Sequence, residues 1–524
     1  MVALLLAFGP AQAREVFAGT AWYRGDLHAH TSYSTDGASA EQGDCLGECG
    51  PIDTVFATAR ANGLDFVAIT DHLNGSSEIE RPQVAPAEFA AWWALIQGGD
   101  DTAGGFVVIP AGEVYFATAT APFGHKTLLF FGPADLLAGF TYAEAWPTGV
   151  VDYDTLDDCA QIDGWLEGLQ AAYGDVLALP HHPMATRPMP TDWGCHTERW
   201  EPAVEVYSRH GTSLDPLDPY DPLQQGITSE GAVAVALDPA GYGYDLGFVA
   251  GTDRHDTRPG EVCALDQSLA SPSQYGGGLT LVALPEGADF DRAAIHDAIV
   301  AHHTVASSGP AIPLSVSFTA EGRGLGGLGD RLTVPEGSAL TVRVAVPDSA
   351  APAVLGMDLI GPSGPLVPLV AEGGGVWEAR VGVGAVDTWV YVDVRVDGDV
   401  WWGPGACEDG GADALEHLWA SPSRVEVGPP AEDTGVTASD TASTDTAPTD
   451  TALTDTAGTE PADSAGEEPP AGGCGCGTGG LSWLLLGPAF VWRRRARSSA
   501  GDHLPSGHPD IGDVRRTPVE DDRR

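Results

Sequence analysis

The chain has 524 residues, of which 43% are hydrophobic, so it is long enough for two or three domains with separate cores. Its 74 acidic residues outnumber 25 basic ones, which gives a formal net charge of −49 at pH 7. A field of this sign repels polyanions and excludes non-specific binding of DNA or RNA, whereas a small anionic substrate stays compatible with it because a metal cluster reverses the potential locally.

The chain begins with an apolar run, residues 1–13, that ends in Ala11-Gln12-Ala13. This small-x-small ending is typical of a signal-peptidase site, so we expect a signal peptide over 1–13 and export of the protein. The run contains no Lys or Arg, which leaves a buried strand as the alternative.

Six cysteines lie in the body of the chain, an even number that allows three disulfides in an oxidising compartment. They are Cys45, Cys49, Cys159, Cys195, Cys263 and Cys407. Spacing does not choose among their pairings. Cys45 and Cys49 also resemble half of a zinc knuckle, but no second cysteine pair follows at the needed spacing, which favours a disulfide.

Residues 14–310 alternate short apolar runs with helical patterns. The runs that predict buried strands are 64–70, 106–110, 127–131, 176–180, 204–208 and 246–252. Amphipathic stretches lie between several of them, such as 52–63, where Gly63 is placed to end a helix. Alternating strands and helices of this length predict an α/β domain with a parallel sheet, closed or open.

From residue 311 to 428 the pattern changes, because apolar and polar residues alternate and Gly/Pro turns separate the runs. This pattern predicts a small antiparallel β-sandwich. Its tryptophans, such as Trp377 and Trp389, are expected in the core.

The rest of the chain is of low complexity at first. Residues 429–473 are rich in Thr, Asp and Ala with no aromatic residue, which predicts a disordered stalk. Residues 474–497 then resemble the tripartite C-terminal sorting signals of myxobacterial surface proteins, with a motif at Cys474 and Cys476, an apolar run and an arginine cluster. The resemblance implies processing near these cysteines and retention at the cell surface or outer membrane. A short membrane anchor without processing is the alternative, and 498–524 are expected to form a disordered tail.

Metal-binding residue types recur where the predicted strands of 14–310 end. The stretch GDLHAHTSYSTDG, residues 25–37, places His28 and His30 at i and i+2, where an extended strand turns both to one side. The other residues at or near strand ends are Asp36, Asp71, His72, Glu113, His125, His181, His182, Asp253 and His255. The carboxyl ends of parallel strands meet at one rim, so these side chains are predicted to form a metal site.

These motifs in this order, DLHAHTSYSTDG, ITDH, GEV, GH, HHP and GTDRH, resemble those of the polymerase-and-histidinol-phosphatase (PHP) superfamily, and more narrowly its exported carbaryl-hydrolase-like branch. The resemblance spans about 290 residues. It implies a distorted (β/α)7 TIM-like barrel that holds two or three divalent metal ions, followed by a β-sandwich.

The resemblance also implies a ligand for each position. His28, His30 and Asp253 would hold the first metal together with a bridging Glu113. His125 and His182 would join Glu113 at the second metal, with His181 as the alternative to His182. Asp36, His72 and His255 would form the third. Imidazole and carboxylate ligands suit Zn, Mn or Fe, and the sequence does not separate these.

Such a centre predicts a hydrolase, in which Asp253 accepts a proton and Arg254 neutralises a substrate oxygen. Arg254 in a salt bridge at the rim is the alternative, and Arg209 and His210 are weaker candidates for the substrate contact. A phosphoesterase acting on a small molecule is expected; a carboxylic or carbamic ester hydrolase and a non-catalytic surface-binding protein are the alternatives. His302 and His303 are expected at the surface or behind the ligands, as is Glu205 behind them. The oligomeric state is left open.

Overall fold

The computed structural model describes residues 15–34, 50–73, 84–85, 87–117, 122–145, 159–186, 190–216, 220, 223, 226–263, 276–398 and 415–429. They all belong to the first of the two compact units of the chain, Met1–Val436 and Thr437–Arg524. Several predictions lie outside the described residues: the signal peptide, the stalk, the sorting segment with Cys474 and Cys476, and the tail. The same holds for Asp36 and for Cys45, Cys49 and Cys407.

The first part of the fold mixes strands and helices. Its strands are β1 (Glu15–Phe17), β2 (Thr20–Asp26), β3 (Phe66–Ile69), β4 (Val107–Ala117), β5 (Pro122–Phe130), β6 (Val176–His181), β7 (Ala203–Ser208), β8 (Gly211–Thr212), β9 (Gly247–Ala250), β10 (Leu279–Pro285) and β11 (Thr304–Ser307). Its α-helices are α1 (Val55–Ala61), α2 (Phe89–Gly98), α3 (Ala134–Leu137), α4 (Tyr142–Ala145), α5 (Cys159–Tyr173), α6 (Val233–Leu237) and α7 (Arg292–Val300). Short 3-10 turns are η1 (Ile52–Thr54), η2 (Thr102–Gly104), η3 (Trp193–Cys195) and η4 (Ser229–Gly231).

Each apolar run of the sequence lies within or across one of these strands. All four residues of β3 are buried, as expected for a strand covered on both faces. Helix α1 follows the predicted amphipathic pattern and buries Val55, Phe56 and Ala59. Gly63, just past α1, adopts φ 77°, the left-handed conformation that glycine supplies where a helix ends.

The predicted α/β class is confirmed, but a closed (β/α)7 barrel is not shown by the described residues. Strands β2, β3 and β4 are parallel, and so are β7 and β9. Strand β5, however, pairs antiparallel with both β4 and β6, and β10 pairs antiparallel with β2. The hydrogen-bonded path therefore runs open from β11 to β6, and β8-β7-β9 form a separate three-stranded sheet.

The second part, where an antiparallel sandwich is predicted, consists almost wholly of strands, but Arg331–Pro335 and Ser423–Gly428 pair in parallel. Its elements are β12 (Ser315–Ala320), β13 (Arg323–Gly327), β14 (Arg331–Pro335), β15 (Ala339–Ala345), η5 (Ala351–Ala353), β16 (Val354–Gly361), β17 (Gly364–Pro368), β18 (Val370–Gly373), β19 (Val376–Gly382), β20 (Thr388–Asp397), β21 (Leu415–Ala420) and β22 (Ser423–Gly428). One sheet has the order β13-β12-β15-β19-β18. The alternation in β15 turns Leu340, Val342 and Val344 into the shared core, and Trp377 and Trp389 are also buried.

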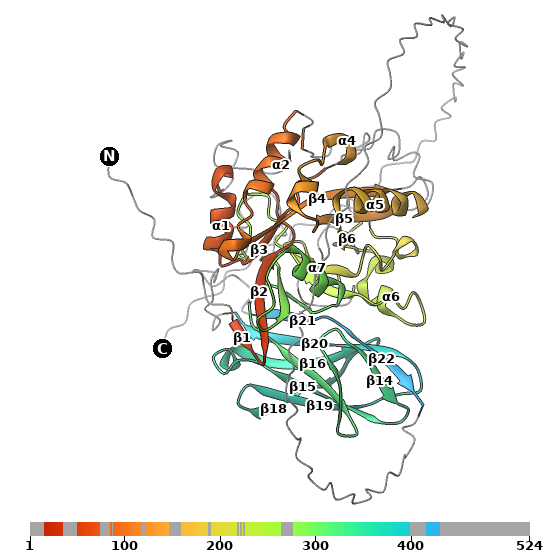
Figure 1. Ribbon diagram of the computed structural model, residues 1–524. Helices are drawn as coiled ribbons and strands as arrows, with labels where there is room; N and C mark the ends of the chain where they lie inside the picture. Colours follow the sequence, from red (N-terminus) through yellow and green to blue (C-terminus); the bar gives the residue numbers. More distant parts are fainter. Residues whose placement is uncertain are drawn as a thin grey trace, which may run out of the picture. The chain divides into compact units, whose positions relative to one another are not determined.

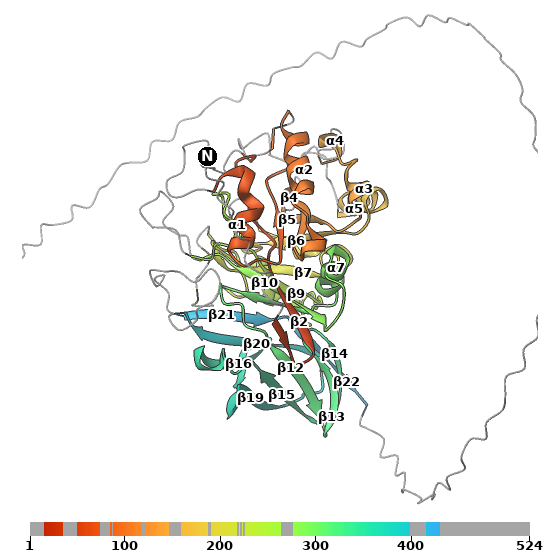
Figure 2. The same ribbon diagram turned by 60° about the vertical axis from the view of Figure 1, so that its left-hand side comes forward.

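The two parts are continuous, because β21 of the sandwich pairs with β11, and β11 with β10. Trp22 and Leu281 accordingly pack in the same hydrophobic cluster as the sandwich core. Both views show the sandwich strands on one side of β2 and helices α1, α2 and α5 on the other (Figures 1 and 2).

Cys159 and Cys195 form a disulfide, and Cys263 is also disulfide-bonded. Within the described part of the chain, no helix has the length and apolar character needed to span a membrane.

Candidate metal centre

The structure brings eight of the nine predicted metal ligands together; the ninth is Asp36. Two follow β2, one follows β3, one each lies within β4 and β5, one follows β6 and two follow β9: His28, His30, His72, Glu113, His125, His182, Asp253 and His255. The alternative ligand, His181, ends β6 and lies in the same cluster. All are buried except His255, which is half-buried.

Backbone pairing continues beyond the strand ends and holds these loops against one another. Ala29 bridges Arg254, with His30 N donating to the Arg254 carbonyl over 2.8 Å. His72 bridges Glu113 in the same parallel sense. The ligand-bearing residues are therefore placed by the sheet itself, which makes their positions more precise than free loops would allow.

Two further buried carboxylates fasten the loops but do not enter the groups of donors. Asp71 accepts hydrogen bonds from the backbone and hydroxyl of Thr31, from the hydroxyl of Ser34 and from Trp92 Nε1. Asp26 accepts in the same way from Thr252, close to Asp253. Thr31 and Ser34, which follow His30 in residues 25–37, thus hold the loop in place, because they satisfy a buried carboxylate.

Glu113 lies at the centre of the cluster. Its Oε2 is 3.4 Å from His28 Nε2, 3.2 Å from His30 Nε2 and 3.3 Å from His72 Nδ1. Its Oε1 is 2.7 Å from His125 Nδ1 and 3.0 Å from His181 Nε2. Each oxygen of one carboxylate therefore faces a different set of imidazoles, the geometry of a ligand that bridges two cations.

Asp253, which follows β9, lies next to the histidines that follow β2. Its Oδ1 lies 3.5 Å from His28 Nε2 and 3.4 Å from His30 Nε2. Its Oδ2 lies 3.0 Å from Nε2 of His210, a residue that the sequence analysis placed only among the weaker substrate contacts. The signal for His210 was its position just after β7, where it follows the same strand-end rule as the ligands.

Four groups of three donor atoms lie within 4.8 Å of one another, close enough for one ion each. They are His28-His30-Glu113, His28-His181-Asp253, His125-His181-His182 and His30-His72-His255. Nδ1 of His182 is buried and has no hydrogen-bond partner within the described structure, as expected of a nitrogen that binds a metal ion. These buried groups can hold a metal ion, and their mixed imidazole and carboxylate donors fit one.

The cluster contains residues that favour their charged forms, Glu113 and His28, and residues that favour their neutral forms, His181 and His182. Burial raises the pKa of Glu113, but the imidazoles of His72 and His181 outweigh this and hold its pKa well below the ordinary value. Burial lowers the pKa of His28, but Asp253 and Glu205 raise it well above the ordinary value.

Burial lowers the pKa of His181 to about 3 and that of His182 well below its ordinary range. These two imidazoles are therefore neutral at neutral pH, the form that binds a metal ion.

The two predicted substrate arginines are placed differently. Arg254 is 3% exposed, pairs through Nε and a terminal nitrogen with Asp256, and donates from Nη1 to the Cys263 carbonyl over 2.9 Å. This is the alternative role, a salt bridge at the rim. Arg209 is half-buried just beyond β7, next to His210.

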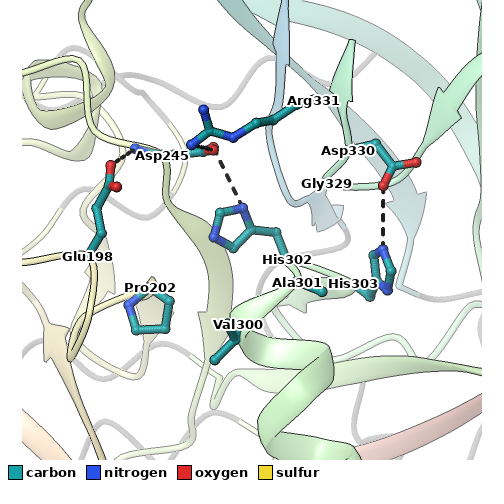
Figure 3. A pocket seen from close by; sticks show the side chains of 10 residues that line it. All are labelled: Glu198, Pro202, Asp245, Val300, Ala301, His302, His303, Gly329, Asp330 and Arg331. Carbon is teal, nitrogen blue, oxygen red and sulfur yellow. Dashed lines mark hydrogen bonds and ion pairs between the residues drawn. The ribbon is translucent and has the colours of Figure 1, made fainter.

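A cavity of about 440 Å³ lies apart from this cluster (Figure 3) and shares no residue with the donor groups. Asp245 stands in it between Arg331, 2.7 Å away, and His302 Nδ1, 3.6 Å away. His302 is buried, whereas the His303 side chain is 42% exposed and faces Asp330. His302 therefore lies in the wall of this cavity and not at the surface or behind the metal-binding residues.

Comparison of the chain with protein-family models, with curated proteins and with solved structures returned no match. The chemistry of the site therefore has to be inferred from its possible metal-binding atoms, which are imidazole nitrogens and carboxylate oxygens on both sides of Glu113.

Proposed function

We propose that the chain is a metal-dependent hydrolase of the PHP type that cleaves phosphate esters of a small molecule. The observation that supports this most is the double contact of Glu113, whose two oxygens face two separate sets of histidines. A carboxylate so placed suits two cations held side by side, and paired cations are a recurring device for ester hydrolysis.

The donor groups suggest which residues would hold each ion. As the resemblance implies, His28, His30 and Asp253 would hold the first, and His125 with His181 or His182 the second, while Glu113 joins both; the short distances of Asp253 to His28 and His30 and of Glu113 to His125 support this. His30, His72 and His255 are the donors for a third. We propose two or three ions of Zn, Mn or Fe, because these accept mixed nitrogen and oxygen ligands.

When bound, such ions supply Lewis-acid polarisation of the ester and a water activated for attack. The chain contributes the rest. Asp253 is ionised, because His28 and His210 outweigh the effect of burial and hold its pKa well below the ordinary value. It therefore carries no proton at neutral pH, and Nε2 of His210 lies 3.0 Å from its Oδ2; we propose that it accepts the proton during hydrolysis.

The placement of Arg254 favours a second candidate, a carboxylic or carbamic ester hydrolase of the carbaryl-hydrolase type. A phosphate substrate calls for guanidinium groups near the cations. Arg254 is instead held by Asp256 and the Cys263 carbonyl, which leaves Arg209 as the remaining arginine among the predicted substrate contacts.

The remaining proposals concern the whole protein. We propose that residues 14–310 form a domain of the PHP superfamily and that 311–428 form an appended sandwich domain. We also propose that the protein is exported and attached to the cell surface or outer membrane through its C-terminus. The Cys159–Cys195 disulfide is consistent with an oxidising compartment.

The test is metal content together with hydrolysis of p-nitrophenyl phosphate and p-nitrophenyl acetate by the full chain. We expect at least two ions per chain and phosphate release that Glu113→Ala abolishes, whereas Glu286→Gln, which changes an exposed carboxylate outside the cluster, has no effect. Ester cleavage alone would favour the second candidate. A wild-type protein that neither binds metal nor cleaves either compound would leave a non-catalytic binding protein.

A further inference from the structure

Glu205 lies on β7 behind the metal-binding residues and is 3% exposed. Its Oε2 is 2.9 Å from Nδ1 of His28, and its Oε1 is 3.7 Å from Nδ1 of His181. His28 follows β2 and His181 ends β6, so one carboxylate reaches donors from two separate strands. His28 belongs to the group with His30 and Glu113, and His181 to the group with His125 and His182; the two also share a group with Asp253.

Both histidines present the same edge to Glu205 and the same edge to the cluster. His28 turns Nε2 toward Glu113 Oε2 at 3.4 Å, and His181 turns Nε2 toward Glu113 Oε1 at 3.0 Å. Nδ1 of each ring therefore lies on the side of Glu205, within hydrogen-bond distance for His28 and at the longer ion-pair distance of 3.7 Å for His181. A carboxylate that accepts Nδ1–H of a histidine fixes its tautomer and its ring orientation, and it makes the opposite nitrogen a better ligand.

The backbone nearby leaves space for this arrangement. A Cβ at Gly251, the residue after β9, would lie 2.3 Å from Cβ of His28 and 2.9 Å from Oε2 of Glu205. No side chain fits there while His28 and Glu205 stay in contact. The loop that carries Asp253 thus begins with a glycine because the two side chains occupy its space.

From these contacts we infer that Glu205 is a positioning residue shared by two metal positions, and that it orients His28 and His181 together. This inference rests on the proposed function, because it requires that metal ions bind at both positions. Its consequence is specific: loss of Glu205 weakens binding at the two positions at once, whereas loss of an ordinary outer contact weakens one.

The experiment is calorimetric titration of the metal-stripped full chain with Zn²⁺, carried out on the wild type, Glu205→Ala and Glu205→Gln. We expect Glu205→Ala to lower the affinity of both binding events by about 10- to 100-fold. Glu205→Gln keeps an oxygen that accepts from Nδ1 of His28, so its loss should be smaller.

The chain offers a matched control in Glu201. This buried glutamate accepts from Nδ1 of His196 at 2.8 Å and from Lys126 at 2.7 Å, but none of the three belongs to the donor groups. Glu201→Ala removes the same kind of contact outside the cluster and should leave both Zn²⁺ affinities unchanged in folded protein. Melting of each metal-free variant measures how much of it is folded.

The outcomes separate the inference from the proposed function. A wild type that binds neither Zn²⁺ nor, in parallel titrations, Mn²⁺ or Fe²⁺ would overturn both. A wild type that binds two ions, with a Glu205→Ala variant that loses affinity for one ion or for none, would overturn the inference and leave the proposed function intact. A variant that only melts earlier, with wild-type Zn²⁺ affinity in its folded fraction, would reduce Glu205 to a structural contact.

Discussion

His181 Nε2 lies 3.0 Å from Oε1 of Glu113, the carboxylate at the centre of the cluster. Its neighbour His182 turns away at φ 31°, with the two rings edge to face and 3.9 Å between centroids. The resemblance to the PHP superfamily implies His182 as the ligand, but the geometry gives His181 the closer approach to Glu113. Both belong to one donor group with His125.

We predict that His181→Gln removes one ion from the protein. The change takes a donor from the position shared with His125 and leaves His30 untouched, so metal content should fall by about one equivalent after dialysis against a weak chelator. His182→Gln is the matched comparison. A His181→Gln variant with full metal content beside a depleted His182→Gln variant would restore the assignment that the family pattern implies.

We predict that Gly251→Ala weakens metal binding although the substitution adds only one methyl group. That methyl would overlap with Cβ of His28 and crowd Oε2 of Glu205, so the pair must separate. Overpacking of this kind also costs about 1–3 kcal/mol of stability. Metal titration and chemical unfolding test the two effects, and Gly384→Ala, where an added Cβ meets nothing within 4 Å and φ likewise lies outside the left-handed region, is the matched control. Unchanged metal affinity in Gly251→Ala would contradict the prediction.

Much of the cluster could be predicted from the sequence, because parallel strands release their carboxyl ends at one rim. His72 follows one predicted apolar run and Asp253 another, and the rule places them together without knowledge of the pairing order. The position of Glu113 could be predicted for the same reason, although β4 continues past it to Ala117.

His125 shows where this reasoning ends. It precedes its apolar run instead of following it, yet in the structure it lies opposite His181 in the ladder. An antiparallel strand brings its beginning, and not its end, to the rim where its neighbours end. The apolarity of residues 127–131 is the same for either direction, so strand direction and the open sheet could not be predicted from the pattern.

The role of Arg254 was harder to predict from the sequence, because it depends on the direction in which one side chain points. Asp256 follows two residues later and pairs with it at the rim. We predict that Arg254→Gln leaves KM for the cleaved ester unchanged and destabilises the protein by about 1–3 kcal/mol, because it leaves the Asp256 carboxylate without its partner. Steady-state kinetics and chemical unfolding check the two parts. A large rise in KM with unchanged stability would instead support Arg254 as the substrate contact expected from the sequence.

The last prediction concerns pH and the cavity at Asp245. Burial lowers the pKa of His302, while Asp245, Glu198 and the Pro202 carbonyl raise it in part and Arg331 lowers it further. The folded protein therefore binds fewer protons here than the unfolded chain, whose histidine titrates near a pKa of about 6.5. The stability that results is fully present above that pH and is lost as the pH falls below it.

We accordingly expect the wild type to lose stability more steeply than His302→Asn between about pH 7 and pH 5. Asparagine suits the test because His302 adopts φ 59°, a left-handed conformation that asparagine tolerates. Every other titrating group is common to both proteins, so the difference between their unfolding free energies isolates His302. His303→Asn is the matched control, because the exposed neighbour faces Asp330 from the open side of the cavity and should follow the wild-type curve. Parallel curves for the wild type and His302→Asn would show that the buried imidazole accepts a proton in the folded state as readily as in the unfolded chain.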